Sequence, residues 1–146
     1  MRATFFLGAI VFVVARAASF EAAEEPDKKI VRAFFAKSKG DKPATTFSAE
    51  VPNIYLIWKG EGLQAGDEMR VVWIAEDVGE VAPKESKIGE RSVIIYKPDE
   101  DGALWLSRPR GRAWPVGQYR TEIYIGKLLV KALRFSIQPG VNVEVH

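Results

Sequence analysis

The 146-residue chain contains no cysteine, and its one histidine, His146, is the last residue. The lack of cysteine excludes disulfides, thiolate metal sites, thiol nucleophiles and lipid attachment through cysteine. Without a histidine in the body of the chain, a Ser–His–Asp triad has no base, and no glycine-rich phosphate loop is present either. The sequence therefore predicts no catalytic residue, no metal site and no cofactor.

The chain also lacks an excess of one charge. Lysine and arginine number 21 against 19 acidic residues, which gives a formal net charge of +2. Nucleic-acid-binding proteins normally carry a large basic excess, so we expect no nucleic-acid partner. The hydrophobic content of 47% argues against disorder over the whole length, and 146 residues fit one globular domain.

The longest uncharged run lies near the N-terminus and has the pattern of an export signal. Arg2 supplies a positive charge, residues 3–15 carry none, and Ala15-Arg16-Ala17 has the small-x-small pattern that signal peptidase recognises. A membrane-spanning helix needs about 20 apolar residues, so a permanent anchor is the less favoured alternative. We expect a helical signal peptide over residues 1–17 and no stable membrane span after its removal.

Removal of those 17 residues leaves a chain of 129 with 19 basic and 19 acidic side chains. Export without disulfides suits a bacterial periplasm or exterior better than a eukaryotic secretory route, so we expect a periplasmic or secreted bacterial protein. Composition then divides the rest into a flexible leader (18–28), one folded domain (29–138) and a short tail (139–146).

The folded part has the pattern of short strands separated by turns. No segment of ten or more residues there keeps the apolar spacing of three and four that is typical of a helix. Residues 68–77 are apolar on both faces, as expected for a central strand covered on two sides. The predicted strands are 30–36, 45–50, 53–59, 68–77, 92–97, 104–107, 119–125 and 128–137.

Three details of the connections are also predicted. Residues 79–89, which include Pro83, should form the longest irregular stretch of the domain. Residues 99–102 (Asp-Glu-Asp-Gly) should form a hairpin turn between the strands 92–97 and 104–107, rather than a calcium loop, because the further ligands of an EF-hand are missing. In the last strand the alternation of apolar residues shifts by one position between Val130 and Leu133, which predicts a β-bulge.

The segment Trp-Pro-Val-Gly-Gln-Tyr at 114–119 predicts a sharp turn into a strand. Pro115 fixes its own φ, and Gly117 permits a positive φ. Tyr119 then opens the strand, with its ring in the core and its hydroxyl bonded to a loop carbonyl. This is the tyrosine corner of immunoglobulin-like sandwiches.

On this motif, together with residues 72–77, 106–109 and 119–124, the chain resembles small exported bacterial proteins with one immunoglobulin-like or fibronectin-III-like domain. The resemblance covers roughly residues 51–137. It implies an all-β, antiparallel β-sandwich of about seven or eight strands, without the cysteine pair of antibody domains. It implies no functional residues, because that family has no established role.

Outward aromatic residues are the first group of candidate binding residues. Trp73 should fill the core, whereas strand alternation places Trp105 and Tyr124 outward. Tyr96 could also point outward. Such rings could bind the face of a sugar or a protein partner, or could simply be isolated surface residues.

Arginines form the second group. Arg108, Arg110 and Arg112 alternate in one loop, where they could clamp phosphate or carboxylate groups or could only keep the loop soluble, balanced by the acids at 99–101. The candidate partner-binding residues are Trp105, Arg120, Tyr124, Arg108, Arg110 and Arg112.

Catalysis would require a pair of carboxylates, for example among Glu76, Asp77 and Glu122, but nothing in their spacing selects a pair. We therefore expect an exported, non-enzymatic β-sandwich that binds a protein or another component of the cell envelope. The alternative is a carbohydrate-binding module that uses the outward aromatic residues.

Overall fold

The computed structural model describes residues 28–140. The predicted signal peptide, residues 18–27 of the leader and residues 141–146 of the tail lie outside this range. Within it the chain forms eight strands and no helix, which confirms the all-β prediction. The strands are β2 (Ile30–Ala36), β3 (Thr46–Ser48), β4 (Asn53–Glu61), β5 (Glu68–Asp77), β6 (Ser86–Ile94), β7 (Asp101–Ser107), β8 (Gly117–Ile125) and β9 (Leu128–Gln138).

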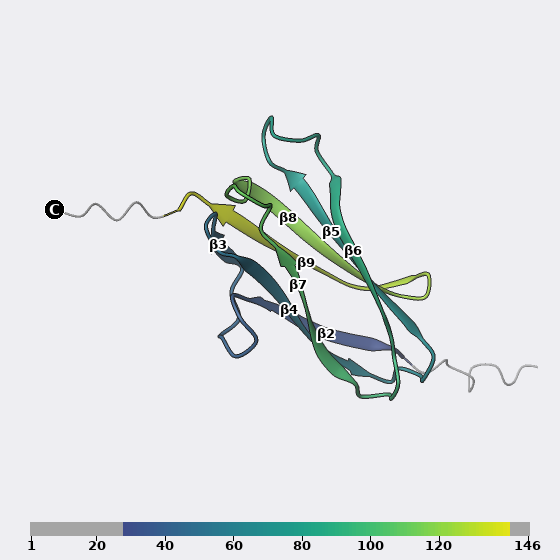
Figure 1. Ribbon diagram of the computed structural model, residues 1–146. Helices are drawn as coiled ribbons and strands as arrows, with labels where there is room; N and C mark the ends of the chain where they lie inside the picture. The colour runs from purple at the N-terminus through teal and green to yellow at the C-terminus, as the bar shows by residue number, and fades with distance from the viewer. Residues whose placement is uncertain (1–27, 141–146) are drawn as a thin grey trace, which may run out of the picture.

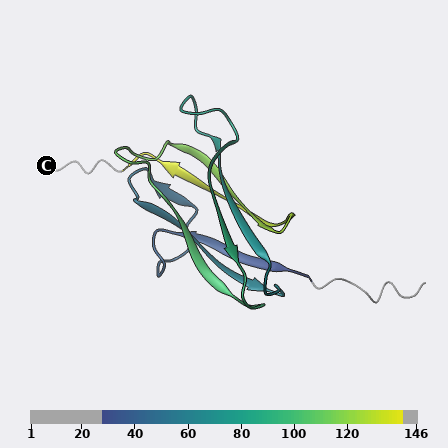
Figure 2. The same cartoon turned by 45° about the vertical axis from the view of Figure 1, so that its right-hand side comes forward.

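The strands form two layers, which Figures 1 and 2 show from two directions. A three-stranded sheet has the order β2-β4-β7, and a five-stranded sheet has the order β3-β9-β8-β5-β6. All pairings are antiparallel except that of β3 with β9. These orders match the A-B-E and G-F-C-C′ neighbours of immunoglobulin-like domains. The described chain is thus an immunoglobulin-like β-sandwich.

Alternation along the strands sets the two sides of each layer. In β4, Ile54, Leu56 and Trp58 are buried between the sheets, whereas the residues between them face outward. In β5 the outward residues Val72 and Ile74 are buried as well, because β8 and β6 flank this strand. The prediction of a central strand with buried residues on both faces is confirmed, although no further layer covers its outer face.

Aromatic rings fill the space between the sheets. Phe135 of β9 lies at the centre, with ring centroids 4.8 Å from Phe35, 5.0 Å from Tyr119 and 6.3 Å from Trp73. These four side chains are at most 2% exposed, as predicted for Trp73. Large rings supply much of the buried apolar area of a small domain, so this cluster is central to its stability.

The tyrosine corner is present as predicted. Tyr119 is 1% exposed, and its hydroxyl donates a hydrogen bond of 2.5 Å to the carbonyl of Pro115. Gly117 has a φ of 154°, and a Cβ atom there would lie 2.2 Å from the carbonyl oxygen of Asp77. Only glycine fits this close approach between the loop and β5.

The predicted bulge in the last strand is confirmed at Val130. Ile123 of β8 pairs with Lys131, but the next residue, Tyr124, pairs with Leu129, so Val130 is the extra residue.

Two predictions about the middle of the chain are wrong. Residues 86–94 form the edge strand β6, so the irregular stretch ends earlier than expected and the strand predicted at 92–97 begins earlier. Six of its nine residues are exposed, because this edge strand of the five-stranded sheet buries few side chains, so its sequence shows little of the alternation that is typical of a strand. A bulge at Ile88 interrupts the alternation of β6 further, because Trp73 of β5 pairs with Gly89 and the next residue, Ile74, pairs with Lys87.

Residues 99–102 also do not join a hairpin. The chain crosses here from one sheet to the other, since β6 pairs with β5 whereas β7 pairs with β4. Ile95 is fully buried where the crossing begins. Glu100 turns the chain by accepting hydrogen bonds from the backbone N–H groups of Tyr96 (2.6 Å) and Lys97 (3.3 Å). The turn also lies earlier than predicted, because Asp101 and Gly102 already belong to β7.

Candidate functional site: two sheet faces and a loop

The six candidate binding residues lie in three separate places. Trp105 lies on the outer face of the three-stranded sheet, because its neighbours Leu104 and Leu106 pair with buried residues of β4. Arg120 and Tyr124 lie on the outer face of the five-stranded sheet, on the opposite side of the sandwich. Arg108, Arg110 and Arg112 lie in the loop between β7 and β8. The structure therefore brings only Arg120 and Tyr124 together.

Arg120 is the centre of an ion-pair network on the five-stranded face. Its guanidinium donates hydrogen bonds to the carboxylates of Glu76 (2.5 Å), Glu85 (2.7 Å) and Glu122 (3.0 Å). The hydrogen bonds that Arg120 donates to Glu85 and Glu76 raise the pKa of Arg120 above its ordinary value, although partial burial opposes this. Arg134 also reaches Glu76, at 3.0 Å. The carboxylates named as a catalytic alternative, Glu76 and Glu122, are thus both held as ion-pair partners.

Glu85 belongs to this network and has an unusual backbone conformation. Its φ is 61°, a left-handed conformation that costs a non-glycine residue about 1 kcal/mol or more. Its N–H donates to the carbonyl of Glu76 at 3.1 Å while its carboxylate accepts from Arg120. The hydrogen bond from Arg120 lowers the pKa of Glu85. Glu85 therefore ties the β5–β6 loop to the sheet face.

Tyr124 is similarly engaged by its neighbours. Its hydroxyl donates to Glu122 at 2.7 Å, which raises the pKa of Tyr124, and the guanidinium of Arg70 lies 4.4 Å from its ring centroid. A cation over an aromatic face is attracted by the ring quadrupole. The polar groups of Arg120 and Tyr124 are consequently satisfied by neighbouring side chains of the same face.

The outer face of the three-stranded sheet is different in character. One row across the sheet consists of Phe34, Ile57 and Ala103, which are direct neighbours on β2, β4 and β7. The next row holds Tyr55 beside Trp105, with ring centroids 5.8 Å apart and planes inclined by 36°. Phe34 is 37% exposed and Trp105 is 40% exposed. We call these five residues the apolar face.

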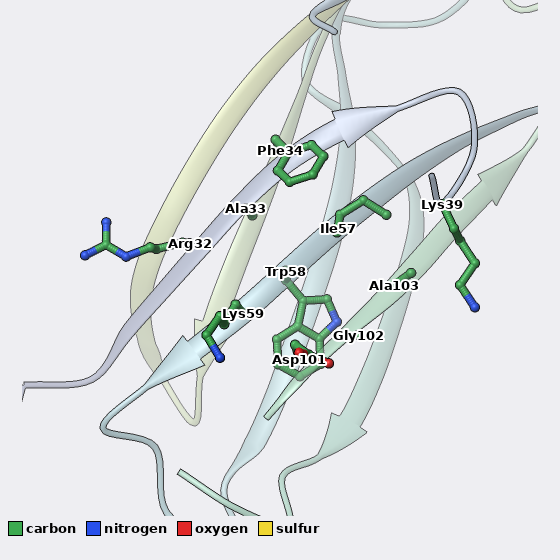
Figure 3. A pocket seen from close by; sticks show the side chains of 10 residues that line it. All are labelled: Arg32, Ala33, Phe34, Lys39, Ile57, Trp58, Lys59, Asp101, Gly102 and Ala103. Carbon is green, nitrogen blue, oxygen red and sulfur yellow. The ribbon is translucent and has the colours of Figure 1, made fainter. Parts of the chain in front are cut away.

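The apolar face borders an open hollow of about 630 Å³, shown in Figure 3. Phe34 and Ile57 lie side by side in this view, on adjacent strands. Charged side chains line the hollow beyond them, with Arg32, Lys59 and Asp101 forming one row across the sheet. This arrangement of an apolar centre and a charged rim is typical of protein-binding surfaces.

Of the apolar face, only Trp105 was predicted from the sequence as a candidate binding residue. Tyr55 and Ile57 were visible as apolar residues on the second parity of the strand 53–59, but without the pairing of β2, β4 and β7 nothing placed Phe34 beside them. The sign available in the sequence was that the strand 53–59 has apolar residues at both sets of alternating positions. In the structure no described element covers its outer face.

The three loop arginines have different surroundings. Arg108 donates to the carbonyl of Glu50 at 2.9 Å, and its guanidinium lies 3.7 Å from the carboxylate of that residue. Arg110 and Arg112 form no ion pair with any residue between 28 and 140. The acids at 99–101 lie at the opposite end of β7, so they do not balance this loop.

Within residues 28–140 no three acidic or histidine side chains are grouped so that they could hold a metal ion. The same range contains no helix with the length and apolar character of a membrane span.

The chain is similar to known proteins in fold alone. No protein-family model matches the sequence, and no curated protein matches it. A β-glucosidase from Listeria innocua in complex with gluconolactone is 5% identical, with a TM-score of 0.53 over 79% of this chain and 16% of that chain. A mutant of the enzyme in complex with laminaribiose is 8% identical, with a TM-score of 0.51 over the same shares of both chains.

An immunoglobulin-like protein from Pseudomonas aeruginosa is 14% identical, with a TM-score of 0.49 over 76% of this chain and 92% of that chain. The chain spans only about a sixth of the length of the β-glucosidases, at 16% of that length. The likeness to those enzymes concerns the sandwich fold of that part.

Proposed function

We propose that the chain is an exported, non-enzymatic β-sandwich that binds a protein, or another envelope component, through its apolar face. The observation that carries this proposal is the exposure of Phe34 and Trp105 on a sheet face that no other described element covers. Exposed rings flanked by charged residues are the usual anchors of a protein interface, because their burial gains much apolar area at little cost in side-chain entropy.

The rigid framework supports this assignment. Tyr55, Ile57 and Trp105 project from paired strands, so binding would order few additional torsions. The five-stranded face, in contrast, presents charged groups that are already paired by Arg120. A partner there would have to compete with those ion pairs, so the apolar face is the better candidate.

The non-enzymatic part of the proposal is supported by the state of the carboxylates. Glu76 and Glu122 are ion-paired with Arg120, and Asp77 accepts a hydrogen bond from the N–H of Gly79 at 3.1 Å. A general acid–base pair needs carboxyl groups that are free to exchange protons with a substrate, whereas these three are engaged by neighbouring groups of the chain.

Export is supported by the sequence of residues 1–17 alone. Fusion of alkaline phosphatase behind residue 28 tests it directly in a bacterial host, because that enzyme is active only outside the cytoplasm. We expect activity, and N-terminal sequencing of the mature protein should begin at Ala18. An inactive fusion, or a mature protein that still starts at Met1, would contradict this part of the proposal.

The carbohydrate alternative has less support. Trp105 and Tyr124 lie on opposite sides of the sandwich, so they cannot form one platform, and Tyr96 lies in the β6–β7 connection. Tyr55 and Trp105 are adjacent, but their planes are inclined by 36°, whereas a flat sugar platform needs nearly coplanar rings.

Site-specific photocross-linking in intact cells tests the binding face. A benzophenone amino acid replaces Phe34 or Trp105, and as a matched control it replaces Tyr96, which is 78% exposed but lies off the face. We expect Phe34 and Trp105 to yield the same cross-linked protein, which is absent from the Tyr96 control.

Equal products from all three positions would refute the assignment of the face. Binding to a glycan array that is lost in W105A, together with no protein adduct, would instead favour the carbohydrate alternative.

A further inference from the structure

A second hollow lies between the β5–β6 loop and the β7–β8 loop, and it has a volume of about 260 Å³. It is lined by Val78, Trp114 and Tyr119, each of which is at most 4% exposed. Ile88 of β6 and Leu106 of β7 form its walls, and Arg112 also lines it. The hollow therefore reaches the core between the edges of the two sheets.

Both loops around this hollow are fixed in place. The indole N–H of Trp114 donates to the carbonyl of Val51 at 2.7 Å, and the Tyr119 hydroxyl is bonded to the carbonyl of Pro115. On the other side, Glu85 ties the β5–β6 loop to Arg120. A cavity that is formed before the ligand arrives requires little ordering on binding.

These hydrogen bonds also determine the chemistry of the hollow. The polar atoms of Trp114 and Tyr119 are already bonded to backbone carbonyls, so their rings offer mainly carbon atoms to a ligand. A ligand group that fills the hollow should therefore be apolar. A cavity of about 150 Å³ holds benzene, so 260 Å³ suits a phenyl ring or a branched chain with a short extension.

Arg112 adds one positive charge to this apolar hollow. It forms no ion pair with any carboxylate in the part of the chain that the structure describes, unlike Arg108, which contacts Glu50. A guanidinium binds a carboxylate through two parallel hydrogen bonds, which gives direction as well as affinity. An apolar cavity with one arginine complements a compact apolar molecule that carries one carboxylate.

We propose that this hollow is a binding site for a small monocarboxylic acid with a compact apolar body. The apolar part lies against Trp114 and Tyr119, and the carboxylate pairs with Arg112. The site is separate from the apolar face, so this inference goes beyond the proposed function and does not depend on it.

The probe for the test is 3-phenylpropanoate, and its neutral amide, 3-phenylpropanamide, is the matched control. In a titration followed by ¹⁵N–¹H NMR, we expect saturable shifts of the Trp114 indole and of the backbone amides around the hollow. A ligand of about ten heavy atoms should bind with a Kd on the order of 1 mM.

Two arginine variants distinguish binding of the acid in the hollow from a general effect of the positive charge of the loop. R112Q should weaken binding of the acid about tenfold, because one charge-assisted contact is lost. R110Q removes the same charge from the same loop but not from the hollow, and it should bind as the wild type does. The amide should bind the wild type and R112Q equally.

Three results would overturn the proposal. They are an absence of saturable shifts at about 10 mM acid, an equal loss of affinity in R110Q and R112Q, and shifts that lie on the apolar face instead of around Trp114. Both arginines are in an exposed loop, so the variants should fold, and a spectrum that matches the wild type verifies this for each one.

Discussion

Replacement of Tyr119 by phenylalanine removes one hydroxyl from the tyrosine corner and leaves the ring in place. The hydroxyl is buried and donates to the Pro115 carbonyl, so its loss should lower the free energy of unfolding at pH 7 by about 1 kcal/mol. Y96F is the matched control, because Tyr96 is 78% exposed and should change the stability by less than about 0.5 kcal/mol.

The same side chain makes a second, opposite contribution at high pH. Burial raises the pKa of Tyr119 from 10.0 to about 12, because the phenolate would be poorly solvated in the core. The stability due to the neutral hydroxyl is fully present below pH 10 and is lost as the pH rises toward 12. The loss is about 1.4 kcal/mol per pH unit in this window, so it reaches about 2 kcal/mol by pH 12.

The two contributions predict that the stability curves of wild type and Y119F cross. The wild type should be more stable by about 1 kcal/mol up to pH 10 and less stable by about 1 kcal/mol at pH 12. Denaturant unfolding followed by tryptophan fluorescence at pH 7, 9, 10, 11 and 12 measures both curves. Parallel curves over this whole range would refute the reasoning, because they would mean that Tyr119 titrates alike in the folded and unfolded chain.

Three further substitutions test the packing and the ion-pair network by the same denaturant assay. T121V should raise the free energy of unfolding by about 1 kcal/mol, because the fully buried hydroxyl of Thr121 has no hydrogen-bond partner within the described residues. A lower free energy of unfolding in T121V would show that this hydroxyl has a hydrogen-bond partner. R120M should cost about 2 kcal/mol, since it leaves the partly buried carboxylate of Glu122 without a cation and that of Glu76 with Arg134 alone. R32M at an exposed ion pair should cost less than about 0.5 kcal/mol, and equal effects of the two substitutions would contradict this. G117A should cost more than about 2 kcal/mol because its Cβ would collide with a carbonyl of β5, and G40A, which meets open space, should be nearly neutral.

Local sequence patterns were sufficient to predict the strands that have a buried face. The alternation of β4 and β8, the two-sided apolar character of β5, and the tyrosine corner each depend on residues close in sequence, and each was predicted correctly. The bulge at Val130 was also visible, because a slip of parity is a local signal.

Features that depend on pairing between distant segments were not predictable in this way. β6 was misplaced because an edge strand with mostly exposed residues carries little alternation. The apolar face was missed because Phe34 and Ile57 are 23 positions apart in the sequence and become neighbours only through the β2–β4 register. The role of Arg120 was unclear for the same reason, since Glu76 and Glu85 reach it from another strand and a loop.

The parallel pairing of β3 with β9 has a mechanical consequence. β2 pairs with β4 in one sheet and β3 pairs with β9 in the other, so tension applied at the start of β2 reaches β3 and the last strand once β2 has separated from β4. When the far end of β9 is held, the two parallel strands are pulled in opposite directions along their length. The contacts between Thr46–Ser48 and β9 then bear the load together and must slide past one another, instead of opening one after another like a zip.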